Sequence, residues 1–97
     1  MSRDPLDKQQ IDKVLADLSG WSLEGNALSR TFEFSNFREA VSFIVRVSFE
    51  AEDLNHHPEI SNVYNRVGIR LTTHDAGDRV TEMDVKLARA IDQFSWV

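Results

Sequence analysis

The three histidines of this chain lie in two short stretches, and acidic residues flank both. His56 and His57 are adjacent within EAEDLNHHPE, residues 50–59, and His74 follows seventeen residues after His57 in LTTHD. Imidazole both donates and accepts a proton near neutral pH, so these side chains are suited to general acid–base chemistry. The chain contains no cysteine, which excludes thiolate nucleophiles and disulfide bonds. Catalysis by the three rings requires that the fold brings the two stretches together.

The size and charge of the chain limit the kinds of protein that it can be. Its 97 residues are expected to form a single domain, 1–97, because there is no room for a second core. The formal net charge of −5 argues against direct binding of nucleic acid. The opening residues MSRDPLDKQQ have no apolar run, and no segment approaches the roughly 20 apolar residues that span a bilayer. We therefore expect a cytoplasmic protein without a membrane partner.

Three stretches show the period of amphipathic helices, and each begins with a capping signal. An N-cap residue is followed three residues later by a side chain that can reach back to the main chain. These pairs are Asp7 with Gln10, Asn36 with Glu39, and Thr81 with Asp84. Gly20 is expected to end the first helix and Pro58 the second.

The second helix carries more apolar side chains than one buried face requires. Its main buried stripe is expected to comprise Phe37, Ala40, Val41, Ile44, Val47 or Ser48, Ala51 and Leu54. Phe43, Val45 and Phe49 fall outside this stripe. They predict a second buried face and hence a homodimer or homotetramer, formed through a helix bundle or through an antiparallel β edge.

Four short strands lie between the helices and form two hairpins. Residues 21–24 and 27–34 flank Gly25-Asn26, a strong signal for a two-residue turn. Residues 59–64 and 67–73 flank Asn65-Arg66. The element order is α-β-β-α-β-β-α, which predicts an α+β fold: a four-stranded antiparallel sheet with three helices on one face.

The second hairpin is expected to bring the histidines together. A two-residue turn at Asn65-Arg66 places Ile60 opposite Leu71, so that the apolar side chains share one face. Extending this register places His57 opposite His74, with their Cβ atoms about 5 Å apart.

Glu52 is expected to contribute a carboxylate to the same site. It precedes His56 by four residues, so both lie on one side if the last helical turn continues that far. The predicted pocket then contains three imidazoles and one carboxylate, with the Thr72 and Thr73 hydroxyls near its rim.

Other interpretations of these residues remain open. Three histidines and a glutamate are a possible zinc ligand set, but adjacent histidines rarely bind one ion and no HExxH motif occurs, so we expect no metal. For Asp84 we favour a capping role over a catalytic one. Trp21 and Tyr64 occupy strand positions where aromatic residues usually pack, although either could form the wall of a site for a ring-shaped ligand.

At these residues the chain resembles the pterin-4a-carbinolamine dehydratase family. The family pattern is an acid, three residues, His-His-Pro, an aromatic residue six further on, a histidine ten beyond it, and a later aspartate. The matching residues are Glu52, His56-His57-Pro58, Tyr64, His74 and Asp84. The segments HHPE, NVYN and LTTHD are similar to those of animal members, and the resemblance covers nearly the whole chain. One departure is Ile60, where many relatives carry an aromatic residue.

The resemblance implies an enzyme that dehydrates 4a-hydroxytetrahydrobiopterin to quinonoid dihydropterin. This reaction recycles the pterin cofactor of aromatic amino-acid hydroxylases and needs no cofactor of its own. The resemblance implies that His56 and His74 form the acid–base pair and that His57 binds the substrate and shares the acid role. Glu52 would orient His56.

A wider set of site residues and partners also follows from the resemblance. The implied pterin-binding residues are His56, His57, Pro58, Thr73, His74, Asp75 and Ala76, with Trp21 and Asp84 in supporting roles. Backbone groups of residues 73–75 would bind the edge of the ring. Implied protein partners are a pterin-dependent hydroxylase or a transcription factor, since some family members stabilise the dimer of a homeodomain protein.

Overall fold

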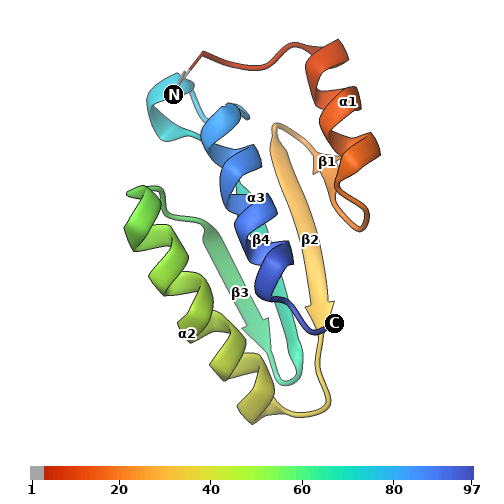
Figure 1. Ribbon diagram of the computed structural model, residues 1–97, viewed down its shortest axis with the longest axis vertical. Helices are drawn as coiled ribbons and strands as arrows, with labels where there is room; N and C mark the ends of the chain where they lie inside the picture. Colours follow the sequence, from red (N-terminus) through yellow and green to blue (C-terminus); the bar gives the residue numbers. More distant parts are fainter. Residues whose placement is uncertain (1–3) are drawn as a thin grey trace.

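The computed structural model describes residues 4–97, so the first three residues of the polar opening segment lie outside the described part (Figure 1). The elements in chain order are α1 (Lys8–Asp17), β1 (Ser22–Glu24), β2 (Ala27–Glu33), α2 (Phe37–Leu54), β3 (Glu59–Val63), β4 (Arg66–Leu71), the 3₁₀ helix η1 (His74–Ala76) and α3 (Glu82–Phe94). The strands form one antiparallel sheet in the order β1-β2-β4-β3. The predicted fold is thus confirmed, with η1 as an unpredicted addition.

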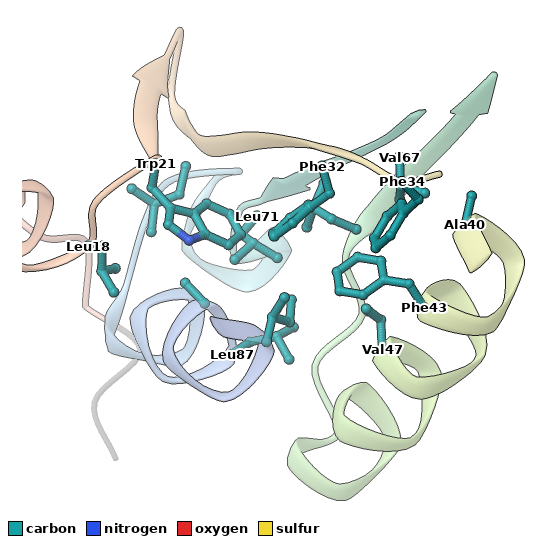
Figure 2. Packing of buried hydrophobic residues seen from close by; sticks show 14 of the residues in the cluster. Leu18, Trp21, Phe32, Phe34, Ala40, Phe43, Val47, Val67, Leu71 and Leu87 are labelled. Atoms are coloured by element: carbon teal, nitrogen blue, oxygen red, sulfur yellow. The ribbon is translucent and has the colours of Figure 1, made fainter. Parts of the chain in front are cut away.

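The hydrophobic core lies between one face of the sheet and the helices. Figure 2 shows Phe32 of β2 and Phe34, which directly follows this strand, pointing toward Phe43 of α2 and Leu87 of α3. The ring centroid of Phe43 is 4.7 Å from that of Phe32 and 4.9 Å from that of Phe34. Rings at these separations pack favourably in tilted arrangements. The aromatic cluster therefore joins α2 to the sheet.

The predicted capping signals are present at the helix starts. Asp7 with Gln10 and Thr81 with Asp84 both form reciprocal capping boxes. The Asn36 side chain accepts a hydrogen bond from the Glu39 amide, as expected. Each of these contacts satisfies backbone N–H groups that have no partner inside the helix. Among residues 4–97, no helix combines the length and the apolar character needed to cross a bilayer.

The buried face of α2 is rotated relative to the predicted one. Phe43 was predicted outside the buried stripe, but its side chain is fully buried. Phe37 and Val41, predicted inside it, are 51% and 38% exposed. The prediction was wrong because the apolar positions of α2 allow two overlapping stripes. The rings of Phe32 in β2 and of Phe34 just after it select the stripe that contains Phe43.

A ridge of exposed apolar side chains runs along the outer side of α2. Phe37, Val41, Val45 and Phe49 are spaced four residues apart and are all exposed. Residues four apart are neighbours on a helix surface, so these side chains form one continuous strip. We call it the α2 ridge.

The register of the second hairpin also differs from the prediction. The first hairpin turns at Gly25-Asn26 as expected, with Glu24 paired to Ala27. The second pairs Val63 with Arg66, so its turn is Tyr64-Asn65 and lies one residue earlier than predicted. Ile60 therefore faces Ile69 instead of Leu71.

Contacts around the turn explain the earlier reversal. Tyr64 adopts a φ of 51°, which a two-residue hairpin turn requires at its first position. The Asn62 side chain donates to the carbonyl oxygens of Tyr64 and Arg66, and Asn65 donates to that of Phe34. The shift alters each pairing by two positions, so the same side chains still face the core.

The burial of Phe43 gives a direct test of the corrected helix face. Phe43→Ala is expected to lower the free energy of unfolding by about 3–5 kcal/mol, because it opens a cavity among four other rings. Leu23→Ala, at an exposed position of β1, should change it by less than about 0.5 kcal/mol. Urea denaturation followed by circular dichroism measures both. Equal losses in the two variants would contradict the packing described here.

Candidate active site

A cleft of about 430 Å³ opens at the end of the β3–β4 hairpin. Its size falls within the range of small-molecule sites. All three histidines line it. The full lining is Asn55, His56, His57, Pro58, Glu59, Arg70, Thr72, Thr73, His74 and Asp75. The two histidine stretches that are separated in sequence therefore meet at one cavity.

The end of α2 directs the adjacent histidines to different environments. The helix ends at Leu54, and Asn55 adopts the left-handed conformation with φ 49° and ψ 45°. The amide of His56 then donates to the Ala51 carbonyl at 3.0 Å, which closes the helix end. The helix thus ends at Leu54, before Pro58, and the prediction that Pro58 ends it was wrong. His56 is consequently buried, whereas His57 is exposed.

His56 is held by a buried carboxylate at the start of α3. Its Nε2 lies 2.5 Å from Oδ1 of Asp84, and the two side chains are only 7% and 0% exposed. Oδ2 of Asp84 also accepts from the amide of Thr81 and from the hydroxyl of Thr73, both at 2.8 Å. The favoured capping role of Asp84 is confirmed. The same carboxylate also fixes the position of His56, which the spacing of these residues in the sequence did not predict.

The other two histidines are exposed and lie beside exposed acids. Nε2 of His57 is 3.8 Å from Oε1 of Glu52, and Nδ1 of His74 is 3.1 Å from Oδ1 of Asp78. The side chains of His57 and His74 are 63% and 92% exposed. His74 belongs to η1, beyond the last strand pair, so the predicted His57–His74 opposition is wrong. Chemically, the cleft combines one largely buried, fixed imidazole with two exposed ones.

The predicted pairing of Glu52 with His56 is also wrong. Because α2 ends at Leu54, His56 does not continue the helical face that carries Glu52. Glu52 is 76% exposed and lies nearest to His57 instead. Asp84 occupies the position beside His56 that was expected for Glu52.

Several other predicted site residues lie away from the cleft. Trp21 is buried in the core, and its indole N–H donates to the Asp92 carboxylate. Tyr64 lies at the hairpin turn, at the opposite end of β3. Ala76 belongs to η1 but is not part of the lining. Ile60 packs partly buried against the core, so it does not substitute for an aromatic residue in the cleft.

The main chain of Thr73 has no hydrogen-bonding capacity left for a ligand. Its amide donates to the Arg79 carbonyl, and its own carbonyl accepts from the amides of Ala76 and Asp78. A carbonyl oxygen has two lone pairs, so both are occupied. The Thr73 backbone therefore does not fit the expected role of binding a ring edge.

The cleft contains charged residues that the sequence did not single out. Arg70 donates from Nε to Glu59 at 3.1 Å and from Nη1 to Glu24 at 2.8 Å. Arg70 and Glu59 are paired in the β-ladder. If the register of the second hairpin had been predicted correctly, Glu59 and Arg70 would have been expected together at the mouth of the site. In the part of the chain from residue 4 onward, no three His, Cys, Asp or Glu side chains converge to form a metal site.

Comparisons with known proteins connect this geometry to a family. The family model for pterin 4 alpha carbinolamine dehydratase matches residues 4–94. A relative from Opitutus terrae, provisionally named pterin-4-alpha-carbinolamine dehydratase, is 56% identical over 92 residues, which cover 95% of each chain. A relative with the same provisional name from Sulfurisphaera tokodaii is 46% identical and covers 91% of this chain and 94% of its own.

A solved structure supports the same relationship. The transcriptional coactivator/pterin dehydratase from Brucella melitensis superimposes with a TM-score of 0.87 at 38% identity. The match covers 93% of this chain and 97% of the Brucella chain.

The two acids near the histidines are expected to differ sharply in their effect on stability. Asp84→Ala removes a helix cap and leaves buried donors of His56 and Thr73 without partners, so it should cost about 3 kcal/mol or more. Glu52→Ala breaks only an exposed contact and should cost less than about 0.5 kcal/mol. Urea titrations of both variants measure the difference. A small loss in Asp84→Ala would show that the buried network is not formed.

Proposed function

The chain belongs to the pterin-4a-carbinolamine dehydratase family, and we propose that it removes water from a 4a-hydroxytetrahydropterin. In this reaction the C4a–O bond breaks, N5 loses its proton, and a C4a–N5 double bond forms in the quinonoid dihydropterin. The observation that carries the proposal is the meeting of three imidazoles, one of them fixed by a buried carboxylate, around a single cleft.

The reaction needs one group that takes a proton and one that gives a proton. We assign these tasks to His56 and His74, with His57 binding the substrate and sharing the acid role. Each positioned imidazole typically contributes about 10²–10⁴ in rate. The lone pair on N5 helps to expel the hydroxyl group, so no metal or redox cofactor takes part in this proposal. Pro58 and Asp75 would contact the bound ring from the cleft wall.

The proposed setting is the cytoplasm, where a pterin-dependent hydroxylase would release the 4a-hydroxy product. The dehydratase then returns the pterin to a form that can be reduced again. Glu59 and Arg70 at the cleft mouth would lie near the pterin side chain, because the imidazoles hold the reacting end of the ring.

A second role in protein association is supported by the α2 ridge. Four exposed apolar side chains in one strip are unusual on a surface that faces only water. We propose that the occupant is a second copy of this chain. Antiparallel pairing about Val45 would place Val41 against Phe49 of the second copy and Arg38 near its Glu52. Apolar and charged positions would then be complementary.

The Brucella protein gives the same surface a further candidate partner. Its name combines transcriptional coactivator with pterin dehydratase. We propose that a transcription-factor partner would also dock on the α2 ridge and leave the histidine cleft free.

The catalytic proposal is tested by replacing each histidine. His56→Ala, His57→Ala and His74→Ala are each expected to lower the catalysed rate at least about tenfold, because each removes a proton-transfer or binding group. Stopped-flow absorbance measures carbinolamine loss with and without the protein. Tyr64→Ala, at the far end of the hairpin, serves as the control and should retain the wild-type rate. A His74→Ala variant with full activity would refute the role given to His74.

The association proposal is tested by placing a charge on the ridge. Val45→Glu is expected to convert the assembly to monomer, since it buries a carboxylate at the centre of the proposed contact. Val63→Glu, at an exposed position of the edge strand β3, is the matched control and should leave the assembly intact. Light scattering coupled to size exclusion measures both masses. Dissociation by Val63→Glu alone would assign the contact to the β edge instead.

A further inference from the structure

We propose that Thr81 and Thr73 form a chain of hydroxyl groups that fixes Asp84 and, through it, the tautomer of His56. In this tautomer Nε2 carries the hydrogen and Nδ1 presents its lone pair to the cleft. The catalytic part of the inference rests on the proposed dehydratase function. Thr73 and Thr81 are positioning residues, because they act through Asp84 and do not touch the substrate.

The direction of the hydroxyl chain follows from counting hydrogens. The Thr73 hydroxyl donates to Oδ2 of Asp84 at 2.8 Å. A hydroxyl has one hydrogen, so Thr73 can only accept in its 2.7 Å contact with the Thr81 hydroxyl. Thr81 therefore donates to Thr73, and its own oxygen accepts from the amide of Met83. The chain runs from Thr81 to Thr73 to Asp84.

The carboxylate at the end of this chain determines which nitrogen of His56 carries hydrogen. Oδ2 of Asp84 already accepts from Thr73 and from the Thr81 amide. Oδ1 lies 2.5 Å from Nε2 of His56. An ionised carboxylate only accepts hydrogen bonds, so Nε2 must be the donor. In the neutral ring Nδ1 is then unprotonated.

Burial indicates where this free nitrogen is accessible. His56 lines the cleft and has no hydrogen bond from Nδ1 to any residue in the described part of the chain. Every fully buried side-chain nitrogen or oxygen among residues 4–97 has a partner. Nδ1 is therefore reached by solvent, and the cleft is the cavity that His56 lines.

This arrangement divides the proton transfers among the three histidines. His56 accepts the N5 proton at Nδ1, and Asp84 stabilises the imidazolium that forms, as the aspartate does in serine protease triads. The proton for the leaving hydroxyl comes from the exposed side of the cleft, where His57 and His74 lie. The hydroxyl chain keeps the Asp84 carboxylate from turning away during the reaction.

The experiment replaces the middle link of the chain. Thr73→Val keeps the shape of the side chain and removes the hydroxyl, whereas Thr73→Ser keeps the hydroxyl. Thr73→Val should lower kcat about tenfold with little change in KM, and Thr73→Ser should restore it. Thr31→Val, on the open face of the sheet, is the control for loss of a threonine hydroxyl and should keep the wild-type kcat.

Nitrogen-15 spectra of the imidazole rings provide a readout that a purely structural role would not change. Wild-type protein and Thr73→Ser should show His56 with hydrogen on Nε2 only, and Thr73→Val should show a mixture of tautomers. If Thr73→Val does not fold, the first link is tested instead by Thr81→Ala, which removes the hydroxyl, and by Thr81→Ser, which keeps it. The Ser variant should keep the single tautomer and the Ala variant should lose it.

The kinetic and spectroscopic results distinguish a failure of the hydroxyl chain from a failure of the proposed dehydratase function. A wild-type His56 with hydrogen on Nδ1 overturns the hydroxyl chain, and so does a folded Thr73→Val with unchanged kcat and tautomer. Protein that shows the expected tautomers but does not accelerate carbinolamine loss supports the hydroxyl chain and overturns the dehydratase proposal.

Discussion

The Asp84 carboxylate constrains this fold strongly, because it is fully removed from solvent and needs hydrogen-bond donors around it. An ionised acid in such a place must be completely hydrogen-bonded. Its donors come from three separate segments: His56 follows α2, Thr73 follows β4, and Thr81 precedes α3. The ends of these elements gather in the upper part of Figure 1. The need to satisfy one buried charge thus gathers two helix ends and a strand end around the cleft.

Adjacent residues acquire different properties because of where α2 ends. Asn55 adopts a left-handed conformation, and the chain changes direction between Leu54 and His56. His56 enters the buried network, whereas His57 stays at the surface beside Glu52. A fixed imidazole can hold one tautomer, and an exposed one can follow the movements of a ligand. Proton transfer at two neighbouring atoms benefits from both properties.

Local signals explain what the sequence predicted correctly. The capping pair Thr81 and Asp84 and the Gly25-Asn26 turn depend on residues within three positions of each other, so their chemistry is readable without the fold. The turn at Tyr64-Asn65 depends on contacts that include Phe34, 31 residues away from Asn65. A local sequence pattern does not contain such a contact, and the predicted turn was therefore wrong by one residue.

Long-range packing explains the remaining errors at the site and on α2. His56 and Asp84 lie 28 residues apart, so spacing alone suggested Glu52 as the partner of the imidazole. The family pattern contains Asp84, but a pattern does not reveal which histidine it holds. The burial of Phe43 was likewise predicted wrongly, because it depends on rings in and just after β2 and on one beyond α3.

Three cleft residues, Asn55, His56 and His57, directly follow the helix that carries the α2 ridge, and this sets how association and catalysis can be coupled. Phe49 at the end of the ridge lies three residues from Glu52, so the two side chains are neighbours on the helix surface. A second chain on the ridge would therefore approach Glu52 and the exposed ring of His57. His56 would be unaffected, because its position depends on α3 and the strand end and not on the outer side of α2. The proposed association would thus alter the rim of the cleft while His56, the proposed proton acceptor, stays fixed.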